Sequence, residues 1–245
     1  MSLRTRKMEL KLLAATTRLL GPWHLRVIRD ELVPTGSLDP RFEQLVPMVQ
    51  PYTLLSIDRL FVLYRLVESS APIPGNIAEA GIFRGGSLRL LREAARGFAP
   101  DKTVHGFDSF SGLPSPSRQV DGQFHAQGDF AAGMNEVSQY LSTRGPSDIQ
   151  LHRVLFAPGM PSAPDSGEPW ALVHLDLDLR DSVAGALSFF EPHVSRGGYV
   201  IIDDYGFRST PGAREAVNAY CRVRKLTPIY FPTGQALIVK PERQT

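Results

Sequence analysis

Two apolar segments that each end in aspartate constrain most strongly how this chain can fold. Residues 171–176 and 198–203 are nearly continuous apolar runs, and the apolar spacing between them, at 182–190, is that of a helix. Apolar strands that alternate with helices are typical of a parallel sheet covered on both faces. The sequence therefore predicts an α/β fold with a mostly parallel sheet.

The remaining elements continue this alternation. Further helices are predicted from apolar spacing at 53–69, 87–95, 135–143 and 211–223. Further strands are predicted at 76–80, 103–107 and 149–156. Ser87 is placed to cap the helix that it begins. Two last apolar segments, 228–231 and 236–239, predict a closing hairpin.

Length and composition agree with one globular core. The chain has 245 residues, of which 42% are hydrophobic and 21% charged, a balance that excludes extensive disorder. The net charge of +2, without basic clusters interleaved with aromatic residues, argues against nucleic acid as a partner. Cys221 is the only cysteine, which excludes an intrachain disulfide and a cysteine zinc site and favours a cytoplasmic location.

The N-terminal part of the chain differs in charge from the rest. Residues 1–30 contain seven basic and two acidic residues, so this segment carries +5 and the remainder −3. Lys11 and Arg18 interrupt the apolar stretch that a secretory signal needs, and no run approaches the roughly 18 apolar residues of a membrane span. We expect 1–50 to be a helical extension that serves assembly, into a homodimer or larger oligomer, or acts as a lid. Attachment of this segment to a membrane surface is the less favoured alternative. We expect residues 51–245 to form the main domain.

The glycines that follow the first predicted strand are suited to a nucleoside ligand. The pattern Glu79-x-Gly81-x-x-x-Gly85-Gly86 differs from the G-x-G-x-x-G signature of dinucleotide sites, and its acid suits an ammonium group better than a diphosphate. Asp108, after the next strand, is placed to bind ribose hydroxyls. S-adenosylmethionine fits these features, because it combines adenosine with an amino acid and has no phosphate. An ordinary glycine-bearing turn explains the first motif alone equally well.

Four aspartates after two neighbouring strands indicate a bound cation. Asp176 and Asp178 follow the first of the apolar strands, and Asp203 and Asp204 follow the second. Such carboxylates repel one another unless a cation offsets their charge. Oxygen ligands without His or Cys favour Mg²⁺. A metal beside a methyl donor can acidify an acceptor hydroxyl, and Asp178 is placed to remove its proton.

Two other functions fit part of this pattern. Asp176-Leu-Asp178 has the D-x-D form of metal-dependent glycosyltransferases, but that function leaves the segment from Glu79 to Gly86 without a role. A cofactor-binding partner subunit that keeps the fold without the chemistry is the non-enzymatic alternative. The intact set of four aspartates argues against it.

Four strings carry a resemblance to a known family: "IAEAGIFRGGS", "HGFDSFSGLP", "HLDLDLRDS" and "GGYVIIDDYG". In this order they resemble the macrocin O-methyltransferase family, over about Tyr52 to Val239. The resemblance implies a class I, Rossmann-like S-adenosylmethionine methyltransferase with a seven-stranded sheet, helices on both faces and an antiparallel terminal strand. It also implies Mg²⁺-dependent O-methylation of a hydroxyl, on a sugar of a secondary metabolite such as an antibiotic, or of a glycan.

The same resemblance assigns roles to residues. Glu79 and Gly81 would lie by the methionine part of the cofactor, Asp108 and Ser109 by its ribose. The implied cofactor-binding set is Thr53, Glu79, Gly81, Arg84, Gly85, Asp108 and Ser109. The implied metal ligands are Asp176, Asp203 and Asp204, with Asp178 as the base. Tyr52 and His125 would contact the acceptor, His125 from a lid formed by 109–133.

The chain departs from the family pattern near the expected acceptor. Leu177 stands where the family usually has Gly, and Arg180-Asp181 stands where it has Tyr-Glu. The third strand ends in Val-Leu-Phe at 154–156 instead of Gly-Trp-Phe. The identity of the acceptor molecule is therefore not implied by the resemblance. His174, inside an apolar strand, is expected to be a packed core histidine.

Overall fold

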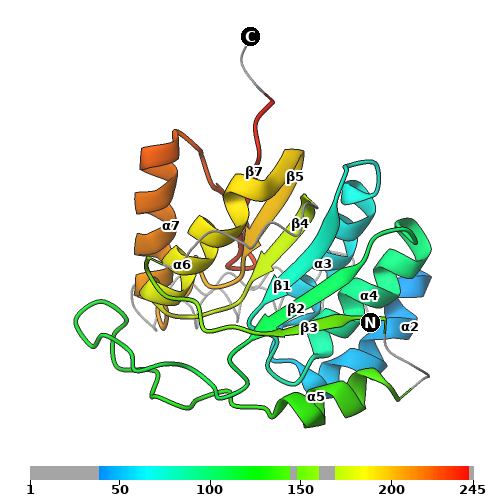
Figure 1. Cartoon of the computed structure of the whole chain (residues 1–245), viewed down its shortest axis with the longest axis horizontal. Helices are drawn as coiled ribbons and strands as arrows, with labels where there is room; N and C mark the ends of the chain where they lie inside the picture. The colour runs from blue at the N-terminus through cyan, green and yellow to red at the C-terminus, as the bar shows by residue number, and fades with distance from the viewer. Residues whose placement is uncertain (1–38, 144–147, 160–168, 243–245) are drawn as a thin grey trace, which may run out of the picture. The chain divides into compact units, whose positions relative to one another are not determined.

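A computed structural model describes residues 39–143, 148–159 and 169–242 of the chain (Figure 1). These residues belong to one compact unit that spans 35–245. The predicted amphipathic helix within 1–30, and with it the expected assembly or membrane contact, lies outside the described residues.

The described residues form a seven-stranded sheet in the order β3-β2-β1-β4-β5-β7-β6. The strands are β1 (Asn76–Ala80), β2 (Val104–Asp108), β3 (Gln150–Arg153), β4 (Trp170–Leu175), β5 (Val194–Ile202), β6 (Ile229–Tyr230) and β7 (Ala236–Val239). Strands β1 to β5 pair in parallel, and β7 runs antiparallel to both β5 and β6. This confirms the predicted mostly parallel sheet and its closing hairpin.

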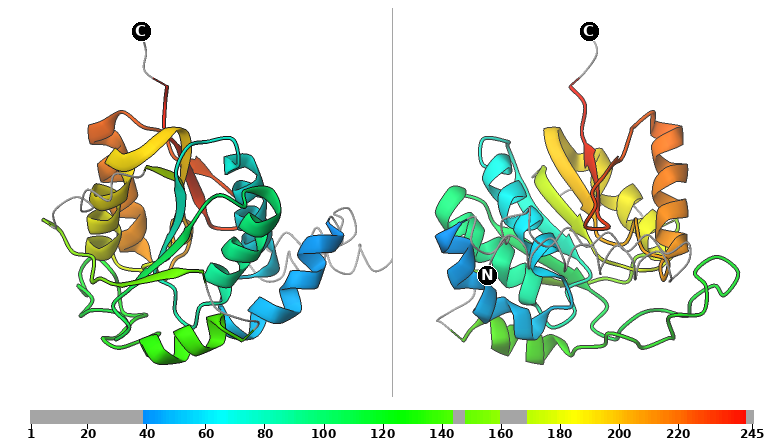
Figure 2. Two further views of the ribbon diagram at one scale, coloured as in Figure 1. Left: turned by 45° about the vertical axis from the view of Figure 1, so that its right-hand side comes forward. Right: turned by 180° about the vertical axis from the view of Figure 1, so that it is seen from behind.

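Helices cover both faces of the sheet, as the sequence predicts (Figure 2). The helices are α2 (Pro40–Val49), α3 (Ile57–Ser70), α4 (Gly86–Phe98), α5 (Met134–Leu141), α6 (Arg180–Phe190) and α7 (Pro211–Arg224), with 3-10 turns η2 (Gln50–Tyr52) and η3 (Glu191–His193). Helices α2 to α5 pack on one face, and α6 and α7 on the other. Successive strand residues alternate between the two cores, Ile77 facing α3 and α4 while Ala78 faces α6 and α7.

Two helix starts differ from the sequence prediction. Helix α3 begins at Ile57 because the Ser56 side chain accepts a hydrogen bond from the Arg59 N–H, so Thr53 stays extended instead of helical. Helix α4 begins at Gly86 behind Gly85, which takes a left-handed φ of 87° and makes no side-chain cap. The prediction that Ser87 caps this helix is therefore wrong, since a glycine without a Cβ makes the turn from strand to helix.

Part of the expected N-terminal extension packs into the main core. Residues 40–49 form α2, whose N-cap Asp39 accepts hydrogen bonds from the Arg41 and Phe42 N–H groups. Phe42 and Val49 are fully buried in the same cluster as α3 and α4. Among the described residues the core thus begins at Phe42, nine residues before residue 51. Within the described residues, no helix combines the length and apolarity that crossing a membrane requires.

Candidate active site

A cavity opens at the carboxyl ends of the parallel strands, where an α/β sheet places its ligands. The carboxyl ends of β1, β2, β4 and β5, with the residues that follow them, supply Gly81, Asp108, Asp176 and Asp204 to its lining. Thr53 and the adjoining residues before α3 line it from another side. The expected cofactor and metal residues therefore converge in large part on one cavity.

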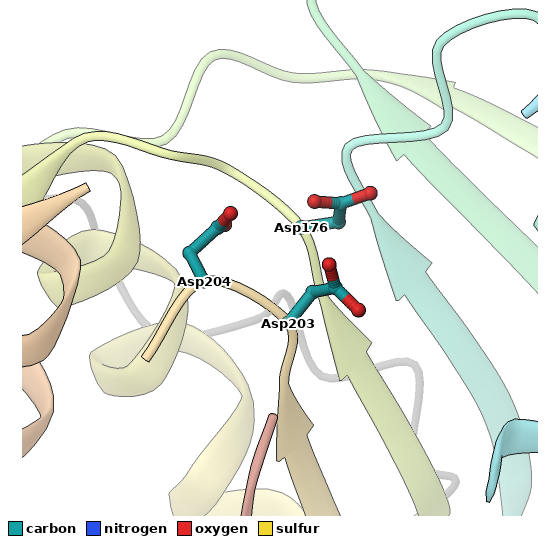
Figure 3. Close-up of side chains that lie close together, drawn as sticks. All are labelled: Asp176, Asp203 and Asp204. Atoms are coloured by element: carbon teal, nitrogen blue, oxygen red, sulfur yellow. The ribbon is translucent and has the colours of Figure 1, made fainter. Parts of the chain in front are cut away.

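Three of the four predicted aspartates form a compact cluster (Figure 3). Asp176 follows β4, and Asp203 and Asp204 follow the neighbouring β5. Each offers a carboxylate oxygen, and these oxygens lie within 4.8 Å of one another. The register of the parallel pair explains this, because Leu175 stands opposite Ile202 and both strands then end together. This spacing of oxygen ligands suits a hard divalent cation such as Mg²⁺.

The cluster is electrostatically unfavourable without a cation. Burial raises the pKa of Asp176 well above its usual range, and repulsion by Asp203 adds to this rise. Burial likewise raises the pKa of Asp204, with repulsion by Asp178 and Asp176 adding to it. A cation bound between these groups would offset both effects. The donor set and its charge therefore fit a metal ion.

Asp203 differs from the other two because it has cationic and polar partners. The Arg59 guanidinium donates from Nη1 to its Oδ2. Gln235 Nε2 donates to its Oδ1 at 3.0 Å, and His174 Nε2 lies 3.9 Å from that oxygen. Burial alone would raise the pKa of Asp203, but His174 and Arg59 outweigh burial and lower it. Asp203 is therefore the aspartate of the cluster that stays ionised most readily.

His174 is buried as predicted, but it is not merely a packed core residue. Its Nδ1 lies 2.7 Å from Glu79 Oε1, with both side chains fully buried. The two residues stand opposite each other on β4 and β1. Burial would lower the pKa of His174, but its contacts with Asp203 and Glu79 raise it to about 10. The side chain is therefore a buried cation between two carboxylates, which the apolar pattern of its strand does not show.

This buried cation predicts how stability depends on pH. The folded chain holds the His174 proton with a pKa of about 10, against 6.5 for a free histidine. The contribution to stability is therefore complete below pH 6.5 and is lost as the pH rises through about 10. The raised pKa values of Asp176 and Asp204 act in the same direction, because each group gains its charge as the pH rises.

We expect the unfolding temperature of the metal-free protein, measured in EDTA, to fall across this pH range. A loss of several kcal/mol is expected from a shift of this size. His174→Gln should flatten the profile, whereas His193→Gln, in η3, should leave it as in the wild type. A wild-type profile that is flat or rises over the same range contradicts the charged state of His174.

Asp178 lies beside the cluster in a strained backbone conformation. Its φ is 58°, in the left-handed region that non-glycine residues rarely adopt. Its N–H donates to Asp204 Oδ2 at 2.9 Å, which holds the turn in place. Burial raises the pKa of Asp178 to about 6, although His125 opposes the rise. A carboxylate with such a pKa can accept a proton near neutral pH.

His125 approaches Asp178 from the long segment between β2 and α5. Its Nε2 lies 3.7 Å from Asp178 Oδ1, and its ring packs on Phe130. The segment is fixed to α6 by Asp121, whose Oδ1 accepts from the Arg180 N–H at 2.8 Å. His125 therefore lies close to Asp178, as the sequence predicts for a residue near the site.

The turn after β1 brings backbone to the bottom of the cavity. Gly81 has a φ of 83°, and a Cβ there would lie 1.7 Å from the Asp176 carbonyl oxygen. Only glycine fits this close approach between the ends of β1 and β4. Asp108 accepts hydrogen bonds from the Ile82 and Phe110 N–H groups, at 2.9 and 2.7 Å. These bonds orient its carboxylate, and Ser109 lines the same cavity.

Six residues of the predicted site do not line this cavity, although two of them, Asp203 and His125, lie next to lining residues. Glu79 is buried behind it on His174, and its Oε2 makes no hydrogen bond to any described residue. Arg84 lies over the Tyr52 ring and pairs with Glu136. Tyr52 stacks on Tyr140 with 3.7 Å between ring centroids. Gly85 forms the cap of α4.

Two residues of the site, Arg59 and Gln235, are not predicted by the sequence. Arg59 lies on the polar side of the amphipathic helix α3, where a solvated arginine is ordinary. Gln235 precedes β7 in the closing hairpin, and its side chain is fully buried. The available signal for Gln235 is a lone amide beside apolar strand residues, which needs a buried partner.

The strand order, the glycine turn and the acids at the strand ends are those of class I S-adenosylmethionine-dependent O-methyltransferases. Comparison with known proteins agrees. The family model for macrocin-O-methyltransferase matches residues 44–231. The mycinamicin III 3''-O-methyltransferase of Micromonospora griseorubida is 32% identical over 185 residues, which cover 69% of this chain and 70% of the relative. The chain belongs to the macrocin O-methyltransferase family.

Other relatives fit the same assignment. The 8-demethyl-8-(2,3-dimethoxy-alpha-L-rhamnosyl)-tetracenomycin-C 4'-O-methyltransferase of Streptomyces olivaceus is 33% identical over 183 residues, which cover 69% of this chain and 67% of the relative. The solved O-methyltransferase NovP has a TM-score of 0.68 at 27% identity, over 78% of this chain and 83% of NovP. The protein is thus an S-adenosylmethionine-dependent O-methyltransferase. The D-x-D glycosyltransferase and the non-catalytic subunit are not supported.

Proposed function

We propose that this enzyme is Mg²⁺-dependent and methylates a sugar hydroxyl of a secondary metabolite or glycan. The observation that carries the proposal is the cluster of Asp176, Asp203 and Asp204, with carboxylate oxygens within 4.8 Å, next to Asp178 and the cofactor turn. The names of the two relatives support the acceptor class, since one is a mycinamicin III 3''-O-methyltransferase and the other a 4'-O-methyltransferase of a rhamnosyl tetracenomycin C.

The chain's own residues divide the work of binding, orientation and proton transfer. Bound Mg²⁺ supplies a Lewis acid that lowers the pKa of an acceptor hydroxyl, and the cofactor supplies the electrophilic methyl group. Asp176, Asp203 and Asp204 would hold the metal. Asp178, on the same strand-end turn as Asp176, would take the hydroxyl proton. The fixed turn between them sets the distance from base to acceptor.

The cofactor would lie along the turns after β1 and β2. Gly81 leaves room for close approach, and the oriented Asp108 carboxylate suits the ribose hydroxyls. Glu79 Oε2, which makes no hydrogen bond to any described residue, would be the acceptor for the cofactor's ammonium group. The side chains at 154–156 add apolar lining where the adenine ring would lie.

The metal requirement can be tested by removing and restoring the ion. Methyl transfer from S-adenosylmethionine to a glycoside with free hydroxyls should fall to background in EDTA and return with Mg²⁺. Full activity in EDTA contradicts the role of the metal. Calorimetry should show binding of S-adenosylhomocysteine and none of a UDP-sugar, which tests the cofactor site without the acceptor.

A further inference from the structure

Arg59 is the one Lys or Arg among the described residues that line the cavity. Its guanidinium is held by three contacts, one from the segment before α3 and two from the connection after β5. Nη1 donates to Asp203 Oδ2, Nη2 donates to the Leu54 carbonyl oxygen at 3.0 Å, and the group lies 5.2 Å from the centroid of the Phe207 ring. The side chain is 16% exposed. Arg59 therefore has a fixed position within the site.

The Arg59 guanidinium contacts the carboxylate of Asp203, which is one of the proposed metal ligands. Asp203 is fully buried, and both of its oxygens already accept hydrogen bonds, one from Arg59 and one from Gln235. A divalent ion on the same carboxylate would lie within a few ångströms of the guanidinium. The two cations repel each other there, in surroundings that screen charge poorly.

We propose that Arg59 is a built-in counter-cation of the aspartate cluster, which holds Asp203 in the metal-free enzyme and competes with the divalent ion for it. The inference rests on the proposed function, because it takes the three aspartates as the metal ligands. It adds that the affinity for Mg²⁺ is set below what the carboxylates alone would give. Removing the guanidinium should therefore tighten metal binding and destabilise the metal-free protein.

A purely orienting role for Arg59 makes the opposite prediction. If the guanidinium only holds Asp203 ready for the metal, its loss leaves the ligand misplaced, and Mg²⁺ binds more weakly. The sign of the change in affinity therefore separates the two roles.

The test is calorimetric titration of the full-length protein with Mg²⁺ alone, in mildly alkaline buffer. Arg59→Met should bind Mg²⁺ at least about tenfold more tightly than the wild type, since one unit charge beside the ion is removed. Arg59→Lys, which keeps the charge, should stay near the wild type. Arg65→Met is the matched control on the same helix, because Arg65 is half exposed and pairs with Glu68 outside the site. Its affinity should be unchanged.

Thermal unfolding with and without Mg²⁺ supplies a second readout. Arg59→Met should unfold at a lower temperature than the wild type without metal, and saturating Mg²⁺ should close most of the gap, because the tighter binding appears as added stability. Phe207→Leu is the milder variant if Arg59→Met does not fold. It removes the ring beneath the guanidinium, loosens Arg59 and should tighten Mg²⁺ binding by a few fold.

Three outcomes of the Mg²⁺ titration distinguish the possible roles of Arg59. Tighter binding in Arg59→Met, or in Phe207→Leu, supports the counter-cation. Unchanged or weaker binding in a folded variant overturns it and leaves the metal site standing. Absence of any Mg²⁺ binding by the wild type overturns the proposed metal dependence itself.

Discussion

Asp176→Asn should lower the rate of methyl transfer by at least about 1000-fold, or about 4 kcal/mol, while making the metal-free protein more stable. The first effect follows because the substitution removes a charged ligand of the proposed metal. The second follows because burial and the repulsion by Asp203 make the ionised Asp176 costly in the folded chain. A gain on the order of 1 kcal/mol is expected.

The two effects are measured by steady-state kinetics with saturating cofactor and by thermal unfolding in EDTA. Asp101→Asn is the matched control, because Asp101 is an exposed carboxylate between α4 and β2, at the sheet edge opposite the cavity. It should change neither value appreciably. A metal-free Asp176→Asn protein that is less stable than the wild type would show that the Asp176 carboxylate does not destabilise the folded chain.

Asp178→Asn should lower kcat by about 10²–10⁴-fold, with the affinities for Mg²⁺ and S-adenosylhomocysteine unchanged. The variant loses the base but keeps the N–H that bonds Asp204, and asparagine tolerates the left-handed φ of 58°. The wild-type rate should rise with pH as Asp178 loses its proton, at about pH 6 or below, because a bound cation favours the ionised form. The variant should lack this rise.

Asp178→Gly provides the control for folding. Glycine adopts the positive φ without strain, so this variant should be at least as stable as the wild type and lose the same factor in kcat. If either variant keeps the wild-type rate and pH profile, another group removes the proton. A rise in KM for the acceptor with kcat unchanged would make Asp178 a binding residue instead.

The aspartate cluster is predictable from the sequence for a simple reason. Asp176 and Asp203 each follow an apolar run, and parallel strands that are neighbours end at the same edge of the sheet. Gly81 is predictable on the same ground, as the residue at a strand end where backbone must come close. These inferences need only the position of a residue relative to its own strand.

The partners of the cluster are not predictable in this way. Arg59 lies on α3 and precedes Asp203 by 144 residues in the sequence. An amphipathic pattern does not distinguish an arginine that contacts a buried carboxylate from one that faces water. The pairing of His174 with Glu79 depends on the register between β1 and β4. A shift of one residue would turn either side chain to the opposite face of the sheet.

The sequence by itself determined the α/β architecture, the glycine turn after β1 and the edge at which the acids gather, because strand periodicity and strand ends are local properties of the chain. Only the tertiary structure decided how the charges of the cluster are balanced. That balance depends on which cations reach Asp203 from α3 and β4, and on which carboxylates remain without one. Such contacts arise from packing between distant segments, where burial strengthens every charge interaction.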